Sequence, residues 1–358
     1  MLVCGTALGP SLFRLSTAKA VTSPPNNASS SKSTDHIYTP VDNSDIMALK
    51  IDDLSNDDIT RLCHGSDNTD VGHCGRSFKR VTHDVIVKYG WSVTADEAAN
   101  QKHAYLHSRG TKIYVPKVYR YFRQSNVGYL VMEFIDGIPL ENILLQEHPE
   151  IIQNLAEAIH AFATKVPPDF PGPRNRGIPR GYLFSEDGAG KALSTVNSLN
   201  SWLDERARLT TSEAGFNFQL SDCVFCHMDL SRRNIILQDE FFYLLDWEYA
   251  GFYPREFEKY CILFIGQKED YDYAYRLSNA LDSVYREAGK KIEDELIIGL
   301  LDRVYRNNLK YSLYVYSECN NDRKLPNLTY QQYRSARDRL GMCEDVWISY
   351  SIVNAVSH

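Results

Sequence analysis

Two short runs of apolar, β-forming residues surround a polar turn in the second half of the chain. Residues 234–237 and 241–245 are mainly apolar, whereas residues 238–240 are polar and favour a turn. This pattern predicts a tight β hairpin whose turn centres near residue 240. Antiparallel pairing then places Asn234 and Asp246 opposite each other at the open end, with their α carbons about 5 to 6 Å apart.

His227, Asp229 and Asn234 stand in the segment HMDLSRRN, which enters this hairpin, and Asp246 follows in LLDWEYAG. A carboxylate and an amide oxygen at this separation suit Mg²⁺, which takes few protein ligands and completes its octahedron with phosphate and water. The carboxylate of Asp229 can face the same pocket and accept a hydroxyl proton, and His227 is expected to hold the loop by hydrogen bonding. The alternative is a hairpin end that carries ordinary turn residues.

The residues before position 137 predict a small, mostly antiparallel sheet with one inserted helix. Residues 1–45 are rich in Ser, Thr, Asn, Ala and Pro and predict a disordered tail. A composition shift near residues 136–139 separates a first lobe, residues 46–136, from a second lobe, residues 137–358. In the first lobe we expect one helix from about Asp57, another from Thr94, and strands near residues 72–79, 85–89, 117–122 and 129–133.

The second lobe is expected to be mainly helical, interrupted by the hairpin. Its helices are predicted over residues 150–164, 194–208, 255–267, 272–287, 293–316 and 329–340. Residues 166–181 contain five prolines and three glycines, which predicts a long surface loop. The whole chain is therefore predicted to be an α+β protein with two lobes.

Composition excludes several classes of function. The net charge of −7, without a segregated basic stripe, argues against nucleic acid binding. The longest apolar runs fall far short of the roughly 18 residues of a membrane-spanning helix, so no membrane association is expected. The eight cysteines are scattered, which favours a reducing, cytoplasmic location. An acid-poor N-terminus leaves a mitochondrial presequence as the minor alternative, because Gly9 and Pro10 interrupt its apolar stretch.

Cys223, Cys226 and His227 form a CxxCH pattern that formally matches a haem attachment site, and the CxxC alone could indicate zinc or redox chemistry. No second CxxC pair completes a zinc site. Val224 and Phe225 indicate a buried strand, so we expect buried, reduced cysteines that pack as small hydrophobic residues.

The segments HMDLSRRN and LDWEYAG resemble the aminoglycoside phosphotransferase family and its eukaryotic relatives, including the choline and ethanolamine kinases. The segments VIVKYG, TADEAANQ, VPKVYRYF and YLVMEFIDG continue the resemblance in family order, over roughly residues 70–260. The resemblance implies a bilobal protein-kinase-like fold. Its small antiparallel N-lobe carries one helix, its larger helical C-lobe contains a β hairpin, and a nucleotide lies in the cleft.

The resemblance also implies roles for individual residues. Asp229 would be the catalytic base, with Asn234 and Asp246 as the Mg²⁺ ligands. Lys88 would hold the α and β phosphates, and Glu97 would be its ion-pair partner. The strand over residues 129–135 would link the lobes and bind an adenine edge through the backbone of Glu133, Phe134 and Ile135.

Two features of the first lobe leave alternatives open. Thr94 and Glu97 fit a capping box, so the Glu97 carboxylate could bind its own helix terminus instead of Lys88. The phosphate-covering loop has too few glycines for a GxGxxG turn, although the backbone near Gly75 and the side chain of Arg76 are candidates to cradle phosphate. This irregular loop supports the alternative of a catalytically inactive pseudokinase.

The expected activity is Mg²⁺-dependent transfer of a phosphoryl group from ATP or GTP to a hydroxyl of a small molecule. No APE-like activation segment follows Asp246, which disfavours a protein substrate. Acidic residues at or beyond the metal motif could bind an amine-bearing substrate, or could belong to a solvated helix face; they are Glu248, Glu269, Asp270 and Asp272. A choline or ethanolamine kinase is a further alternative, because DWEYAG is close to the metal motif of that subfamily.

Overall fold

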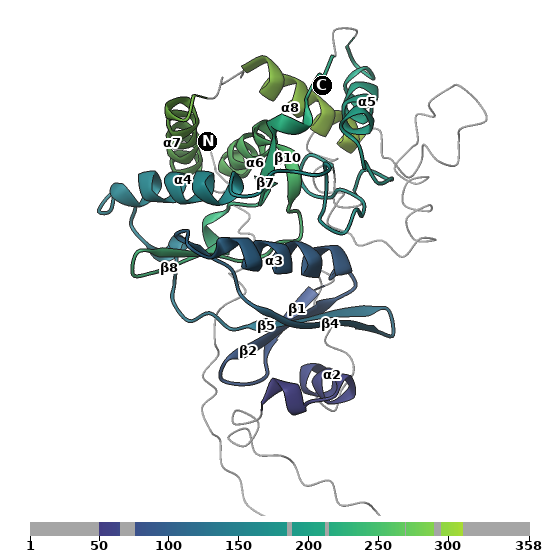
Figure 1. Ribbon diagram of the computed structural model, residues 1–358, viewed down its shortest axis with the longest axis vertical. Helices are drawn as coiled ribbons and strands as arrows, with labels where there is room; N and C mark the ends of the chain where they lie inside the picture. Colours follow the sequence, from purple (N-terminus) through teal and green to yellow (C-terminus); the bar gives the residue numbers. More distant parts are fainter. Residues whose placement is uncertain are drawn as a thin grey trace, which may run out of the picture.

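The structure is a computed structural model that describes residues 50–64, 76–184, 188–211, 215–268, 270–289 and 295–310. The expected tail, the residues 72–75 of the phosphate-covering loop and the helix expected over residues 329–340 lie outside these ranges. Within them the chain forms a smaller part built on one sheet and a larger, mainly helical part (Figure 1). The predicted α+β, two-lobed fold is confirmed.

The smaller lobe is a four-stranded antiparallel sheet in the order β1-β2-β5-β4. Its strands are β1 (Arg76–Arg80), β2 (Val85–Gly90), β4 (Val118–Gln124) and β5 (Val127–Glu133). Helix α3 (Ala95–Ser108) lies on one face of this sheet, and α2 (Asn56–His64), preceded by the short turn η1 (Ile51–Asp53), lies on the other (Figure 1). These elements match the expected helices and strands to within a few residues.

Alternation along β2 determines which side chains face each helix. Val85, Val87 and Tyr89 pack in one cluster with Ile59 of α2. Lys88 points to the opposite face, because side chains alternate along a strand. Its partner in the register on β5 is Leu130, which packs in a cluster with Ala98 of α3. The lysine is therefore directed toward α3 and the interior of the molecule.

A second sheet, in the order β3-β9-β8-β6, joins segments from both lobes. The predicted hairpin is present as β8 (Ile235–Gln238) and β9 (Phe241–Leu244). Strand β3 (Ile113–Tyr114) pairs in parallel with β9, and β6 (Ile138–Pro139), which leads into the turn η2 (Leu140–Asn142), pairs with β8. Strands β7 (Cys223–Cys226) and β10 (Gly251–Pro254) form a separate two-stranded antiparallel sheet. The short turn η3 (Leu220–Asp222) directly precedes β7, and the short turn η4 (Arg232–Asn234) directly precedes β8.

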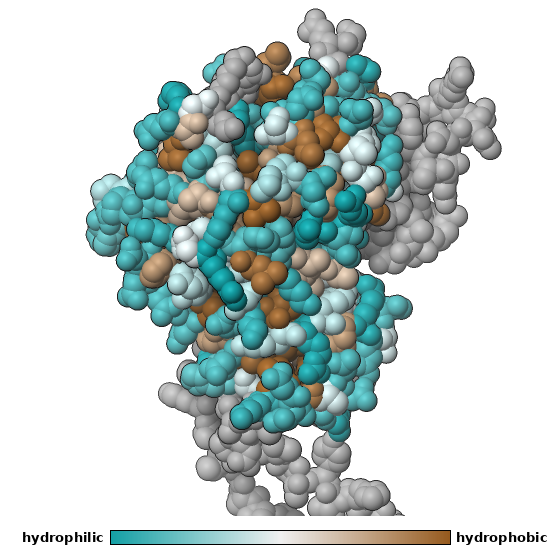
Figure 2. Space-filling view, viewed as in Figure 1, coloured by the Kyte–Doolittle hydropathy of each residue, from teal (hydrophilic) through white to brown (hydrophobic). Residues whose placement is uncertain are grey.

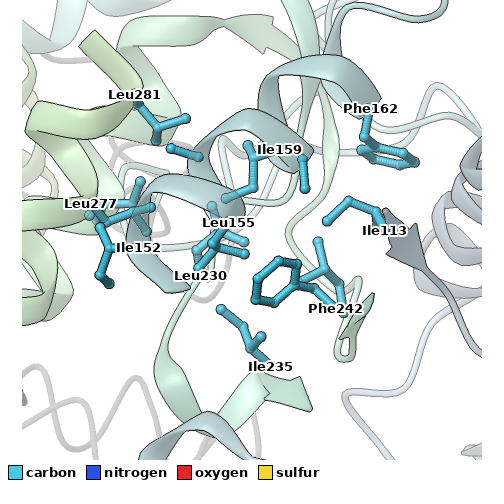
Figure 3. Packing of buried hydrophobic residues seen from close by; sticks show 14 of the residues in the cluster. Ile113, Ile152, Leu155, Ile159, Phe162, Leu230, Ile235, Phe242, Leu277 and Leu281 are labelled. Atoms are coloured by element: carbon cyan, nitrogen blue, oxygen red, sulfur yellow. The ribbon is translucent and has the colours of Figure 1, made fainter. Parts of the chain in front are cut away.

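In the part of the larger lobe that the structure describes, the helices are α4 (Glu150–Ala163), α5 (Val196–Ala207), α6 (Arg255–Lys268), α7 (Tyr271–Glu287) and α8 (Glu295–Lys310). Helix α7 packs against both α4 and α6, while α8 packs against α5 and α6. Figure 3 shows how α4 contributes Leu155 and Ile159, and α7 contributes Leu277, to the core that also holds Phe242 of β9 and Ile113 of β3. This core therefore holds the hairpin rigidly against the helices.

Residues 166–181 contain no helix and no multi-residue strand, as predicted, but they do not form a purely surface loop. Phe170 and Gly172 are buried, and Gly172 exchanges two backbone hydrogen bonds with Phe252 of β10. The expectation of a surface loop was wrong for this part, because the backbone groups near Gly172 find partners inside the protein.

Hydrophilic residues predominate on the face shown in Figure 2, and hydrophobic residues appear there in separate patches. Among the described residues no helix has both the length and the apolar character needed to cross a membrane.

Candidate active site

Lys88 and Glu97 form a buried ion pair between β2 and α3. The side chain of Lys88 is 2% exposed, and its Nζ lies 2.7 Å from Oε1 of Glu97. The hydroxyl of Thr94 accepts the backbone N–H of Glu97 at 3.2 Å, so Thr94 does cap α3. Only this half of the capping box is formed, because the Glu97 carboxylate faces the lysine.

The same ammonium group also contacts the segment that follows the hairpin. Nζ of Lys88 lies 2.9 Å from Oδ1 of Asp246 and 3.6 Å from Oε2 of Glu248. Burial alone would lower the pKa of Lys88, but the charges of Asp246, Glu97 and Glu248 outweigh it and raise the pKa. The lysine therefore stays protonated, which is the charge state that the expected phosphate-binding role requires.

Arg76 completes this cluster from the first position of β1. Its guanidinium group donates a hydrogen bond to Glu248 and lies 3.8 Å from Oδ2 of Asp246. Two cations thus face three carboxylates where the expected metal and phosphate sites meet. The Arg76–Glu248 contact was not predicted, because the two residues are 172 positions apart.

Asp246 has a backbone φ of 64°, which is unusual for a residue other than glycine. Such a conformation costs about 1–3 kcal/mol and persists only when neighbouring contacts hold it. Burial would raise the pKa of its carboxyl group, but the charges of Lys88 and Arg76 outweigh burial and lower the pKa. Asp246 is therefore ionised, and its backbone directs it toward Lys88.

The expected pairing of Asn234 with Asp246 is off by one residue. Register pairs Ile235 with Leu244, and the N–H of Leu245 donates to the carbonyl of Asn234 at 2.9 Å. The turn consists of two residues, 239 and 240, and is therefore centred between them, which shifts the register by one position. Asp246 lies one residue beyond the end of the pairing.

Asn234 and Asp229 are in direct contact. Nδ2 of Asn234 donates to Oδ2 of Asp229 at 2.9 Å and to the Asp229 carbonyl at 3.1 Å. Two further groups approach the Asp229 carboxylate: the hydroxyl of Tyr182 at 3.3 Å and the guanidinium of Arg233 at 3.1 Å. Tyr182 was not predicted, and it comes from the chain directly after the proline-rich loop.

His227 holds the loop, as expected, and its hydrogen bonds define its tautomer. Nε2 lies 2.9 Å from the carbonyl of Leu245, and Nδ1 lies 3.2 Å from the backbone nitrogen of Asp229. Since a carbonyl can only accept and a backbone N–H can only donate, Nε2 carries the proton and Nδ1 accepts. Burial lowers the pKa of His227, which favours this neutral form.

Glu258 of α6 binds the backbone of the same loop. Its two carboxylate oxygens accept the N–H groups of His227, at 2.5 Å, and Met228, at 2.9 Å. Burial raises the pKa of Glu258 to about 7, although the two N–H donors oppose this shift. Sequence reasoning missed this residue, because REFEKY reads as an ordinary helix start.

Only part of the expected adenine-binding backbone is available. The N–H of Glu133 donates to the carbonyl of Lys117 at 2.9 Å, and the N–H of Phe134 donates to the carbonyl of Asp84 at 2.8 Å. Within the described ranges, the N–H of Ile135 has no hydrogen-bond partner. Of the three backbone N–H groups in this expected segment, that of Ile135 is therefore the candidate donor to an adenine edge. Gly75 lies outside the described residues.

The acidic residues considered for amine binding are largely engaged by arginines. Glu248 contacts Arg76, as described above. Asp270 caps α7 and forms an ion pair with Arg232, and Asp272 lies 3.4 Å from Arg276. Glu269 lies outside the described residues. The structure therefore places Glu248 and Asp270 in partly buried ion pairs, whereas Asp272 is 63% exposed on the solvated face of α7.

The two cysteines of the CxxCH pattern, Cys223 and Cys226, are free thiols. Both lie in β7 and are buried, and Sγ of Cys226 faces the carbonyl of Tyr253 at 3.5 Å. The expectation of buried, reduced cysteines is confirmed for this pair.

The oxygen atoms of Asn234 and Asp246 fit a hard divalent cation. Because Nδ2 of Asn234 is committed to Asp229, its amide oxygen is the atom left for a metal. Among the described residues no group of three or more His, Cys, Asp or Glu side chains is arranged to hold a metal ion. This donor set suits Mg²⁺, which commonly keeps water and phosphate in most of its positions.

The chain was also compared with known protein families, curated proteins and solved structures. The model of the phosphotransferase enzyme family (APH) matches residues 75–290, more than half of the chain. No curated protein matches the sequence significantly.

Several solved structures are similar to the chain. A thermostable mutant of aminoglycoside phosphotransferase APH(4)-Ia, in its apo form, is 14% identical, with 66% of this chain and 82% of that chain covered and a TM-score of 0.43. Aminoglycoside phosphotransferase APH(3'')-Id from Streptomyces rimosus is 18% identical, with 66% and 91% covered and a TM-score of 0.42. The amicoumacin kinase hAmiN, in complex with AMP-PNP, Ca²⁺ and Ami, is 12% identical, with 70% and 78% covered and a TM-score of 0.39.

The matched residues 75–290 include Lys88, Asp229, Asn234 and Asp246, and they extend through the sheet of the smaller lobe, the hairpin and most of the larger lobe. Since the family model covers more than half of the chain, the chain belongs to the phosphotransferase enzyme family.

Proposed function

We propose that this phosphotransferase transfers the γ-phosphoryl group of ATP or GTP to a hydroxyl group of a small molecule, in a reaction that requires Mg²⁺. The observation that carries the proposal is the convergence of two contacts. Lys88 binds Asp246 at 2.9 Å, and Asn234 binds Asp229 at 2.9 Å. The backbone hydrogen bond between Leu245 and Asn234 joins these two pairs in one site.

Each residue then has a defined task. Asp229 accepts the proton of the acceptor hydroxyl as its oxygen attacks the γ phosphorus and the bond to the β-phosphate oxygen breaks. Lys88 neutralises the phosphates of the nucleotide. Asn234 and Asp246 hold Mg²⁺, which when bound neutralises charge on the phosphate oxygens. Rate is gained mainly through alignment and charge neutralisation, so fixed positions for these groups matter more than the basicity of Asp229.

A small acceptor is favoured by the chain that follows Asp246. Residues 247–250 form a turn, β10 then pairs with β7, and α6 begins at Arg255. This short connection contains no segment of the length that protein kinases use to bind a polypeptide substrate.

The proposal is tested by two measurements on the purified full chain. ATP or GTP is expected to raise the melting temperature strongly only when Mg²⁺ is present. A library of alcohols, sugars and amino alcohols, including choline and ethanolamine, is then screened for new phosphate esters. Absence of any Mg²⁺-dependent stabilisation by either nucleotide overturns the proposal.

Asp229→Asn is the matched control for the screen. It removes the proton acceptor but keeps the size of the side chain, so transfer should fall by about 100- to 10,000-fold while nucleotide-dependent stabilisation remains. If the wild-type protein binds nucleotide but forms no more ester than Asp229→Asn does, the chain is a pseudokinase.

A further inference from the structure

Asn100 of α3 connects three segments that are distant in the sequence. Its side chain is completely buried, and Nδ2 donates to the carbonyl of Ala250 at 2.7 Å and to the carbonyl of Trp247 at 3.2 Å. Oδ1 accepts the backbone N–H of Arg174 at 2.8 Å. Both ends of one amide are therefore used, and two of its three hydrogen bonds go to the turn that follows Asp246.

The unfavourable backbone conformation of Asp246 has to be stabilised by contacts from residues outside the turn. The φ of 64° at Asp246 is held from the preceding side by His227, whose Nε2 donates to the carbonyl of Leu245 at 2.9 Å. On the following side, Asn100 binds the carbonyl of Trp247, the next residue along the chain. Asp246 is thus fixed between two buried hydrogen-bond donors that come from different lobes.

Asn100 also lies three residues after Glu97 on the same helix. Residues at this spacing share one helix face. Glu97 binds Lys88 at 2.7 Å, so α3 orients the lysine through Glu97 and the turn after Asp246 through Asn100. One rigid helix therefore determines the position of Lys88 relative to Asp246.

We propose that Asn100 is a positioning residue for the metal-ligand function of Asp246. This inference rests on the proposed function, since it assumes that Asp246 binds Mg²⁺. The amide of Asn100 touches neither metal nor substrate. It holds the turn in the conformation that directs the Asp246 carboxylate toward the proposed metal site. Its loss should therefore weaken the binding of Mg²⁺ more than the binding of the nucleotide or of the acceptor molecule.

Gln101 provides a matched control at the next position of the same helix. It is equally buried, and its Nε2 donates at 2.8 Å to the carbonyl of Pro116, which lies in the connection between β3 and β4. Gln101→Ala and Asn100→Ala each remove a buried amide from α3, and only the second removes contacts to the turn after Asp246. A role limited to the packing of α3 would make the two variants alike.

The experiment measures the melting temperature of the full chain at saturating nucleotide while Mg²⁺ is titrated. Asn100→Ala should raise the Mg²⁺ concentration for half-maximal stabilisation by about tenfold or more, and Gln101→Ala by less than about twofold. Once an acceptor is identified, kcat at limiting Mg²⁺ should fall for Asn100→Ala, with the acceptor KM unchanged. Asn100→Ser, which keeps a short polar group, serves as a second variant with the same expected direction.

Three results overturn the inference. The first is a Mg²⁺ midpoint for Asn100→Ala equal to that of the wild type. The second is the same shift in Gln101→Ala. The third is failure of both Asn100 variants to fold while Gln101→Ala folds, which would make Asn100 a residue required for folding. If wild-type protein itself lacks Mg²⁺-dependent stabilisation by nucleotide, the proposed function has failed, a result distinct from these three.

Discussion

Lys88 binds Asp246 across the boundary between the two lobes, with Nζ 2.9 Å from Oδ1. The lysine belongs to the sheet of the smaller lobe, and Asp246 follows the hairpin of the larger one. A buried cation that holds carboxylates from both lobes contributes to stability as well as to the site. The two contributions can be separated by mutation.

Lys88→Met should destabilise the protein strongly, because it leaves the buried carboxylate of Glu97 without its cation and removes the closest cation from the partly buried Asp246. Removal of one partner from a buried ion pair typically costs about 3–5 kcal/mol. The free energy of unfolding in urea measures this loss. A second mutation, Glu97→Gln, should recover part of the stability of Lys88→Met without recovering phosphoryl transfer. A loss below about 1 kcal/mol in the single variant, the range of an exposed pair, would contradict the expectation.

The stability of the His227 loop should depend on pH. Burial lowers the pKa of His227 below its usual 6.5, so the folded protein resists protonation while the unfolded chain accepts a proton near pH 6.5. The stability that His227 contributes is thus fully present above about pH 6.5 and is lost as pH falls below it.

Comparison with His227→Gln isolates this effect. The raised pKa of Glu258 has the opposite effect on the pH dependence of stability. The folded protein binds the Glu258 proton more tightly than the unfolded chain does, so this residue favours folding as the pH falls. Both proteins contain Glu258, so this effect cancels in the comparison. The difference in unfolding free energy between wild type and His227→Gln should therefore shrink as pH falls from 7 to 5. A difference that is constant over this range would show that His227 does not titrate differently in the two states.

Glu258→Gln should slow phosphoryl transfer while nucleotide binding persists. A glutamine offers one acceptor oxygen where the carboxylate offers two, so one N–H of the loop, at His227 or Met228, loses its partner. A decrease in kcat of about 10- to 100-fold is expected, in line with the loss of groups that orient a catalytic site. Glu256→Gln is the control, since Glu256 lies on the same helix and contacts Arg255. Equal decreases in both variants would refute a specific role for Glu258.

Tyr182→Phe tests the acceptor side of the site. The Tyr182 hydroxyl donates to Oδ1 of Asp229 at 3.3 Å, so its removal leaves the aromatic ring and deletes one hydrogen bond to the proposed base. A single hydrogen bond to a charged group contributes about 1.5–3 kcal/mol, which corresponds to a roughly 10- to 150-fold decrease in kcat/KM for the acceptor. The Mg²⁺-dependent stabilisation by nucleotide should stay unchanged. If that stabilisation weakened, Tyr182 would contribute to the binding of the nucleotide and Mg²⁺, and its role would not be limited to the acceptor.

The parts of the site that depend on local pattern were predictable from the sequence. The apolar runs around residues 238–240 indicated the hairpin, and the family resemblance indicated the pairing of Lys88 with Glu97. The order of the six family segments related these elements to each other. The structure brings Lys88, Glu97 and Asp246 together as these patterns suggest.

The rest depends on contacts that no local pattern contains. The Arg76–Glu248 pair joins residues that are far apart in the sequence. The contacts of Asn100 and Glu258 are also distant in the sequence, and they are made to backbone groups, which every residue has. The register predicted for Asp246 was wrong by one position for another reason. A turn centred on one residue and a turn of two residues give hairpin registers that differ by one position. Local composition does not distinguish these two turns.

The pairing of β3 with β9 limits how the two lobes can move relative to each other. β3 comes from the first half of the chain but is bonded to the hairpin, so the backbone crosses between the two lobes three times, at residues 109–112, 115–117 and 134–137. Three crossings close together in the fold tie the hairpin to the smaller lobe by covalent chain as well as by hydrogen bonds. We therefore expect any movement of one lobe relative to the other to carry β3 along with the hairpin.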